Sequence, residues 1–372
     1  MFKKSLAAVA VLGAFAASSM AADVTLYGKV DMGFQYNNEE VTDFNGIKTN
    51  EDALKLNSGV GQASRIGFKA TEDLGNGYKV SFKLENGFKA DTGDMSTKNK
   101  LFDREASLTV SSEWGTLMAG RFGSFSGAAS ATDILMSRVD AFDGGHADAE
   151  LVAFDKLDNA LAYFTPKFAG FQAAAIYSFK ADNAEQNAAE KATREGHGDA
   201  TRYAGIALTY DIGALQTAIG YEQMIRSNLP EERFGDQKIV TFGGNYDFDM
   251  FKLYAGAQYF EGAKELYGQE VAPTGFDGIE GYSFHVGTTF DALAGHFDTG
   301  IYYVDATANE DATHDRDASY FGIAGRYVYD LSKRTNIRTS LGYNQVDVDK
   351  LTETHDYKAE NYVAKVSLTH NF

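Results

Sequence analysis

The segment Asn361-Tyr362-Val363-Ala364-Lys365-Val366-Ser367-Leu368-Thr369-His370-Asn371-Phe372 decides the fold. Tyr362, Ala364, Val366, Leu368, His370 and Phe372 share one parity, and the residues between them share the other. Successive side chains of a strand point to opposite faces, so this period of two suits a strand with one face in lipid and one in water. The same alternation recurs along most of the chain. It predicts an all-β fold, a transmembrane antiparallel β-barrel of a bacterial outer membrane.

The first residues have the features of a secretory signal peptide. Lys3 and Lys4 precede an apolar run from Leu6 to Ala17, and Ser19-Met20-Ala21 is a small-x-small processing site. The apolar run is shorter than the roughly 20 residues that a spanning helix needs. We therefore expect residues 1–21 to be removed, with cleavage after Ala22 as the alternative, and residues 22–372 to form the barrel.

Composition excludes several classes of protein. The formal net charge of −18 argues against nucleic acid as a partner. There is no cysteine, so neither disulfides nor thiolate metal sites are possible. The seven histidines lack metal-ligand spacing and no Gly-x-Ser-x-Gly motif occurs, so we expect no metal, no cofactor and no catalytic residues. Abundant Phe, Tyr and Gly with only 3 Pro suit strands, tight turns and aromatic belts.

The alternation predicts 16 strands joined by connections that are short and long in turn. The expected strands are 24–36, 64–72, 78–89, 102–112, 116–123, 159–166, 171–180, 201–211, 215–225, 238–248, 251–262, 280–290, 296–306, 318–329, 335–347 and 359–372. Short turns on one side and long polar loops on the other are typical of outer-membrane barrels. A barrel of about 16 strands is too wide for its own side chains to fill and leaves an aqueous channel.

The residues also carry a family resemblance. Val24-Thr25-Leu26-Tyr27-Gly28, the block from Ser64 to Gly77, the stretches 114–121 and 158–171, and the terminal Phe372 resemble the general trimeric porins of Gram-negative outer membranes. The resemblance implies a homotrimer in lipid and lipopolysaccharide, passive diffusion of small hydrophilic solutes, and a third loop folded into the lumen. It also implies that Phe372 is the signal read by the barrel-assembly machinery; an interfacial aromatic anchor is a second, compatible role for this residue.

The longest connection, 124–158, is the expected constriction loop, because a loop of this length calls for a functional explanation. Its candidate acids are Asp133, Asp140, Asp143 and Asp148. Facing them we expect inward-pointing wall cations, since a cation on a spanning strand is costly toward lipid. The candidates are Arg65, Lys69, Lys83, Arg104 and Arg121. The parity of Arg104 matches that of Ala106 and Leu108, so either those residues face inward or a bulge intervenes.

Charge patterns give a weak expectation about ion preference. Where the family has an arginine shortly before Asp158-Asn159, this chain has Lys156 and Leu157, and its other long loops are rich in Asp and Glu. Acidic vestibules concentrate cations, so we expect modest cation selectivity or near neutrality. A substrate-specific channel, for sugars or organic acids, is the alternative function, and an outer-membrane hydrolase is a third hypothesis.

Overall fold

The structure is a computed structural model that describes residues 23–127, 130–142, 151–181, 193–228, 235–263, 265–266, 269–270, 278–311, 314–350 and 353–372. The expected leader, 1–21, lies outside the described residues. The wall strands are β1 (Thr25–Thr42), β2 (Lys48–Ser58), β3 (Arg65–Gly75), β4 (Tyr78–Gly87), β5 (Glu105–Ser112), β6 (Gly115–Gly123), β7 (Lys156–Phe164), β8 (Phe171–Ser178), β9 (Arg202–Ile212), β10 (Leu215–Ile225), β11 (Gln237–Asp247), β12 (Lys252–Ala263), β15 (Ile279–Ala292), β16 (Gly295–Asp311), β17 (His314–Ser332), β18 (Thr335–Val348) and β19 (Tyr357–Asn371). The short pair β13 (Glu265–Leu266) and β14 (Gln269–Glu270) forms a separate sheet.

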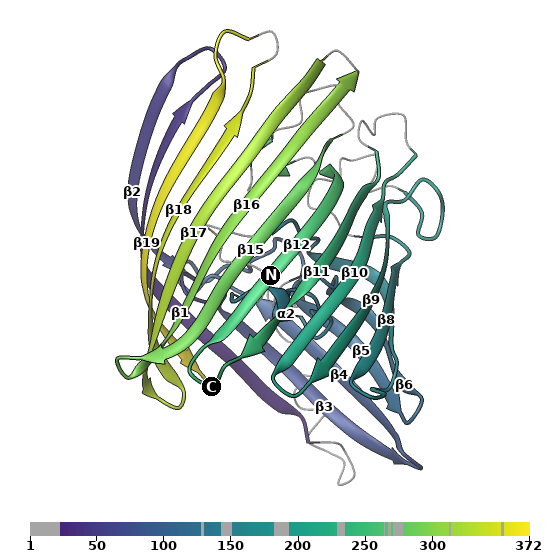
Figure 1. Ribbon diagram of the computed structural model, residues 1–372. Helices are drawn as coiled ribbons and strands as arrows, with labels where there is room; N and C mark the ends of the chain where they lie inside the picture. Colours follow the sequence, from purple (N-terminus) through teal and green to yellow (C-terminus); the bar gives the residue numbers. More distant parts are fainter. Residues whose placement is uncertain are drawn as a thin grey trace.

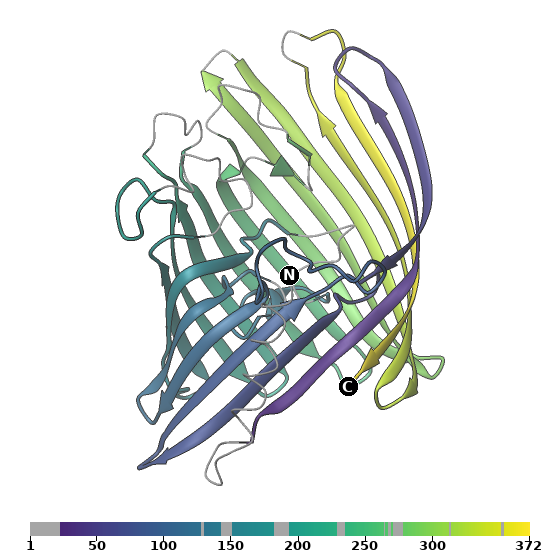
Figure 2. The same cartoon turned by 180° about the vertical axis from the view of Figure 1, so that it is seen from behind.

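The sheet closes into a cylinder with antiparallel neighbours throughout (Figures 1 and 2). The last strand, β19, pairs with β1 from Lys29↔Asn371 to Thr42↔Lys358. Closure satisfies every backbone donor and acceptor that would otherwise face hydrocarbon. The predicted 16-stranded transmembrane barrel is therefore confirmed.

The additional strand segment, β2, corrects one part of the prediction. Residues 38–63 were expected to form a loop, but β1 continues to Thr42 and β2 pairs antiparallel with its upper half. The lower half of β1 pairs with β3, so β2 and β3 follow one another beside β1 and share one wall position. Leu54 and Leu56 lie opposite Tyr36 and Phe34, and such cross-strand pairs stabilise the hairpin.

The two faces of the wall follow the predicted alternation. On β15, Tyr282, Phe284 and Val286 are 56%, 50% and 56% exposed on the outer face. Ser283 and His285, which alternate with them, are buried inside. Within the described residues, no helix is both long enough and apolar enough to cross a membrane.

The C-terminal residue completes the seam of the barrel. The Phe372 N–H donates to the Gly28 carbonyl at 3.0 Å, and the Gly28 N–H donates to the Phe372 carbonyl at 3.1 Å. The Phe372 ring lies so close to Gly28 that a Cβ there would be 2.4 Å from a ring carbon. Gly28 is thus required by this close approach.

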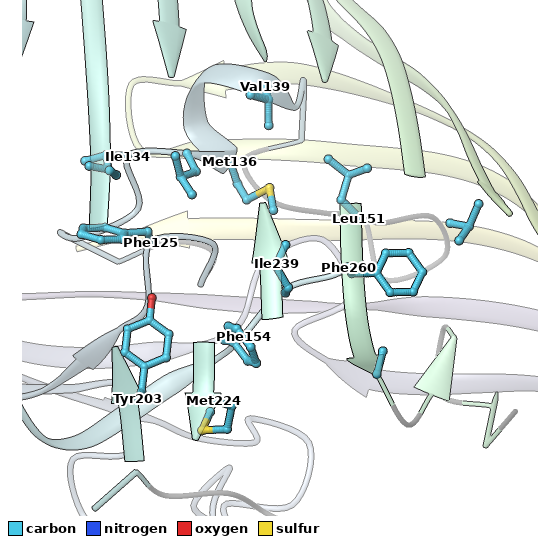
Figure 3. Close-up of a cluster of buried hydrophobic side chains, with 14 of the residues drawn as sticks. Phe125, Ile134, Met136, Val139, Leu151, Phe154, Tyr203, Met224, Ile239 and Phe260 are labelled. Atoms are coloured by element: carbon cyan, nitrogen blue, oxygen red, sulfur yellow. The ribbon is translucent and has the colours of Figure 1, made fainter. Parts of the chain in front are cut away.

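The main apolar cluster lies inside the cylinder, between the β6–β7 connection and one half of the wall. Figure 3 shows Phe125, Ile134, Met136 and Val139 of that connection close to Tyr203, Met224, Ile239 and Phe260 of the wall. The described parts of this connection, 124–127, 130–142 and 151–155, therefore contribute side chains to the core on the wall.

Candidate functional site

The β6–β7 connection, residues 124–155, is fixed inside the barrel by a buried carboxylate. Glu222 of β10 is fully buried, and its Oε1 accepts from the Ser126 N–H at 3.2 Å and the Ser126 hydroxyl at 3.1 Å. The Tyr203 hydroxyl of β9 donates to the same oxygen at 2.6 Å. Charge-assisted hydrogen bonds of this kind are the strong ones, so the first limb of the loop is held at β9 and β10.

The middle of the loop forms the short helix α2 (Met136–Val139), which lies on wall glycines. A Cβ at Gly220 would be 2.5 Å from the Leu135 side chain, and a Cβ at Gly243 would be 2.9 Å from that of Val139. Gly256, opposite Gly243 on β12, also faces Val139. Glycines at inward positions of β10, β11 and β12 therefore make room for α2.

Polar contacts also attach the loop to the same half of the wall. Arg138 donates to both carboxylate oxygens of Asp211, at 3.2 and 3.1 Å. Its carbonyl accepts from the Asn245 side chain at 2.9 Å. Gln258 of β12 donates to the Val152 carbonyl at 2.9 Å. The loop thus lies against the half of the barrel built from β9 to β16.

Of the four loop acids, the structure describes Asp133 and Asp140, and their hydrogen-bond partners Ser137 and Tyr302, with the neighbouring His285, are not among the expected wall cations. Asp140 is buried, and its Oδ1 accepts from the Tyr302 hydroxyl at 2.9 Å and lies 3.5 Å from Nε2 of His285. The Asp133 carboxylate accepts from the Ser137 N–H at 3.1 Å and so stabilises the first turn of α2. Asp143 and Asp148 lie outside the described residues. Asp133 and Asp140 hold the loop in place, because their carboxylates find partners within the loop or on the wall behind it.

The expected wall cations gather around wall acids instead. Arg65 and Arg104 both contact Oε1 of Glu85, at 3.6 and 2.7 Å. Lys83 contacts Glu105 at 2.7 Å and Glu85 at 3.7 Å. Arg104 reaches inward because it precedes β5: its N–H donates to the Glu85 carbonyl, while Glu105 is the residue paired with Glu85. Arg104 and Glu105 are thus both opposite Glu85 of β4. This extra residue explains why Arg104 points inward although its parity matches that of the outward-facing Leu108.

A second group lies at the mouth of the β6–β7 loop. The Arg121 guanidinium donates to Asp158 at 2.6 Å, and Lys100 contacts the other Asp158 oxygen at 2.8 Å. Asp158 belongs to β7, so the constriction loop ends at 155 and the predicted boundary at 158 is corrected. Lys156 forms an ion pair with Asp155 at 3.4 Å, and Arg104 and Arg121 are near enough to repel it.

Further cations, which the sequence did not single out for the site, extend this row around the wall. Lys29 of β1 lies near Arg65, Arg104 and Arg338, which repel it, and near Glu85, which attracts it. Arg338 of β18 lies near Arg326 and near the acids Asp31, Asp298 and Asp330. Arg326 of β17 contacts Asp298 at 2.7 Å. The sequence did contain a signal for Lys29, because it has the same parity as Asp31 and therefore points to the inner face of β1. We call the complete row the basic arc; its members are Lys156, Arg121, Arg104, Arg65, Lys29, Arg338 and Arg326.

Two of the acids that the basic arc contacts are withdrawn from water, whereas Asp158 beside Arg121 is 28% exposed and Asp155 beside Lys156 is 88% exposed. Glu85 exposes 4% of its side chain, whereas Arg65 and Arg104, which share it, expose 15% and 16%. The Asp298 side chain is 3% exposed under Arg326, which is 20% exposed. The arc occupies the strands that the loop leaves uncovered, from β7 through β1 to β17. The opening between loop and wall is therefore lined by cation tips on one side.

Lys69 lies outside the arc. It sits nearer the short turns, with its ammonium 5.1 Å from the centroid of the Tyr27 ring.

Comparison with known proteins fits this arrangement. Residues 7–349 match the family described as Gram-negative porin. The chain belongs to this family. It is 31% identical to an outer membrane porin protein of Bordetella pertussis, over 90% of this chain and 92% of that one. It is 28% identical to outer membrane porin protein 32 of Delftia acidovorans, over 92% and 89% of the two chains.

A solved structure of an anion-selective porin from Comamonas acidovorans has the same fold, with a TM-score of 0.63 at 24% identity. It covers 95% of this chain and 100% of that chain. As a member of the family, this porin is a passive channel in the outer membrane of a Gram-negative bacterium.

Proposed function

We propose that this porin passes small hydrophilic solutes with a preference for anions, and that the basic arc sets this preference. The observation that carries the proposal is that Arg65, Arg104 and Arg326 expose more of their side chains than the acids they contact, Glu85 and Asp298. A solute at the constriction meets guanidinium and ammonium groups directly, while carboxylates such as Glu85 lie behind them. Rings of charge at a narrow point are what sets pore selectivity.

The arc outweighs the acidic outer loops for a physical reason. Charges in a wide, water-filled mouth are screened beyond about 8 Å at physiological salt. The charges of the basic arc lie at the constriction, where the water-filled path is narrowest and the low-dielectric walls focus their electric field. The proposal therefore departs from the weak expectation of cation selectivity or neutrality that the loop composition suggested. The anion-selective porin from Comamonas acidovorans agrees in sign, although that selectivity is a property of the relative and not yet of this chain.

The test is the zero-current potential of the purified porin in a planar bilayer with a tenfold KCl gradient. We expect a potential of the sign that marks chloride as the more permeant ion. Lys333→Gln, in the exposed β17–β18 turn and away from the arc, is the matched control and keeps that potential. A wild-type potential of the opposite sign refutes the proposed selectivity. Saturable blockade by one sugar would favour the alternative of a substrate-specific channel.

The proposal has further parts that rest on the family resemblance. Residues 1–21 are removed on export, three copies assemble through their barrel walls, and the outer surface is solvated by lipid and lipopolysaccharide. Phe372 acts in assembly through the barrel-assembly machinery, in addition to its place at the seam. No catalytic step is assigned to the chain. Mass spectrometry of the native oligomer tests the cleavage site and the trimer together.

A further inference from the structure

A recess lies below the constriction loop, toward the short turns. Its volume is about 860 Å³, and strands β3 to β5 form one side of it. Residues Ala131 and Ile134 of the loop, with Met118 of β6 and Phe164 of β7, form the other side. The two sides differ in chemistry, and this difference carries the inference.

The strand side is a ladder of hydroxyl groups below a pair of lysines. In register across β3, β4 and β5, Lys69 lies opposite Lys83 and Lys83 opposite Ser107. The next inward row is Thr71, Ser81 and Thr109. Thr71 and Ser81 hydroxyls are 2.9 Å apart, so one donates to the other and the second hydroxyl proton is free to be offered to a solute.

Lys69 and Lys83 form a pair of like charges in which Lys83 already contacts two carboxylates, Glu105 at 2.7 Å and Glu85 at 3.7 Å. Like charges directly opposite on one face of a sheet destabilise the pair. Glu105 exposes only 4% of its side chain beneath Lys83. The Lys69 ammonium lies over the face of the Tyr27 ring, and Lys69 lines the recess. An anion between Lys69 and Lys83 would remove the repulsion. Asp23, exposed at the start of β1, is the other carboxylate on the lining.

The opposite side has two polar lining residues, Thr116 and Gln172, and both have partners outside the recess: Thr116 shares a hydrogen bond with Ser111, and Gln172 donates to the Thr165 carbonyl. Phe164 packs edge-on against Phe125 of the loop at 6.5 Å between ring centroids, which fixes its ring at the recess. Met118, Phe164 and Ile134 thus form an apolar surface across from the lysines. A solute with a charged end and a hydrocarbon body satisfies both sides, whereas a fully hydrated anion satisfies only one.

We infer that this recess is a binding subsite for organic anions with one carboxylate and an apolar body, placed on the periplasmic side of the constriction. The inference rests on the proposed anion preference and deepens it by naming a class of solute. The carboxylate lies between Lys69 and Lys83 with the hydroxyl ladder beside it, and the body packs on Ile134 and Phe164. Solutes of this class dwell in the pore longer than inorganic anions.

The test compares benzoate with gluconate, two monovalent carboxylates of which only the first has an apolar body. Each is added to the periplasmic side of single channels that carry chloride current. We expect benzoate to reduce the current saturably, at a concentration at least about tenfold lower than gluconate, in keeping with burial of an aromatic ring. Lys69→Gln and Ile134→Ser each raise the half-blocking benzoate concentration by about threefold or more.

Lys79→Gln is the matched control. Lys79 lies opposite Asp73, in the row that follows Thr71 and Ser81 toward the turn, and it does not line the recess. The control variant leaves the half-blocking concentration within about twofold of wild type. Equal effects of benzoate and gluconate overturn the subsite while the zero-current potential still shows chloride preference. If the wild-type porin is blocked by benzoate but its zero-current potential shows no chloride preference, the proposed selectivity is overturned and the subsite is not. Unchanged block in both recess variants overturns the placement of the subsite.

Discussion

At the scale of residues, the character of the pore depends on which side chain of each charged pair reaches water. Arg65 and Lys83 were expected to point inward because a cation facing lipid is costly, but this argument does not say which residue a side chain meets inside the barrel. Asp140 looked like a pore acid because it lies in the right loop. The closed barrel brings it to Tyr302, and this contact between residues far apart in the chain is decided only by closure.

Charge changes at Glu85 and Arg104 have opposite predicted effects. Arg104→Gln removes an exposed charge and lowers the chloride-to-potassium permeability ratio. Glu85→Gln removes a covered carboxylate and raises it, because Arg65 and Arg104 stay charged. One charge about 8 Å away in water is worth about 0.5 kcal/mol, or roughly a twofold change in the ratio. Zero-current potentials measure both, and shifts of the same sign in the two variants contradict the assignment.

The buried Glu222 is predicted to hold the first limb of the loop. Glu222→Ala leaves the Ser126 N–H and the Tyr203 hydroxyl without their acceptor, at about 1–3 kcal/mol for each buried group. We expect larger fluctuations of single-channel current, because the loop leaves the wall more often. Glu261→Ala, at an exposed rim ion pair, is the control. Current noise equal to wild type in Glu222→Ala would show that the loop does not depend on this carboxylate.

At the scale of elements, the constriction is a loop packed on a half of the wall that is shaped to receive it. The sequence predicted the loop by its length, and its described residues, 124–127, 130–142 and 151–155, include side chains that pack inside the barrel. It did not predict on which half the loop lies, although inward glycines at 220, 243 and 256 were a readable signal. The strand β2 was missed because residues 48–58 are mostly polar and show little apolar alternation. Few apolar side chains take part in their pairing with the upper half of β1.

Filling the glycine surface is predicted to displace α2. In Gly256→Val the new side chain meets Val139, since even a Cβ would lie 3.1 Å from its Cβ. The loop must move toward the basic arc, so single-channel conductance falls or becomes heterogeneous. Gly325→Val on β17 is the matched control, because a Cβ there meets nothing within 4 Å. Equal conductance in both variants would contradict the contact between α2 and β12.

At the scale of the whole molecule, alternation along the strands and the lengths of the connections sufficed to predict the barrel. The reason is physical: a strand that faces lipid and water shows its period of two locally, and closure is forced by unpaired backbone groups. The basic arc was only partly predicted, because it joins residues from β7, β6, β3, β1, β18 and β17 whose proximity depends on the closed cylinder. Lys29 and Arg338 meet only after β1 and β19 have paired.

The central claim is that the partly exposed cations of the arc, and not the acids of the loop, decide which ions pass. The most direct measurement is the zero-current potential, in a tenfold KCl gradient, of wild type and of a variant with Arg65, Arg104 and Arg121 all changed to Gln. We predict chloride preference in the wild type and its loss in the variant. A wild type that prefers potassium, or a variant with the potential of the wild type, would contradict the claim.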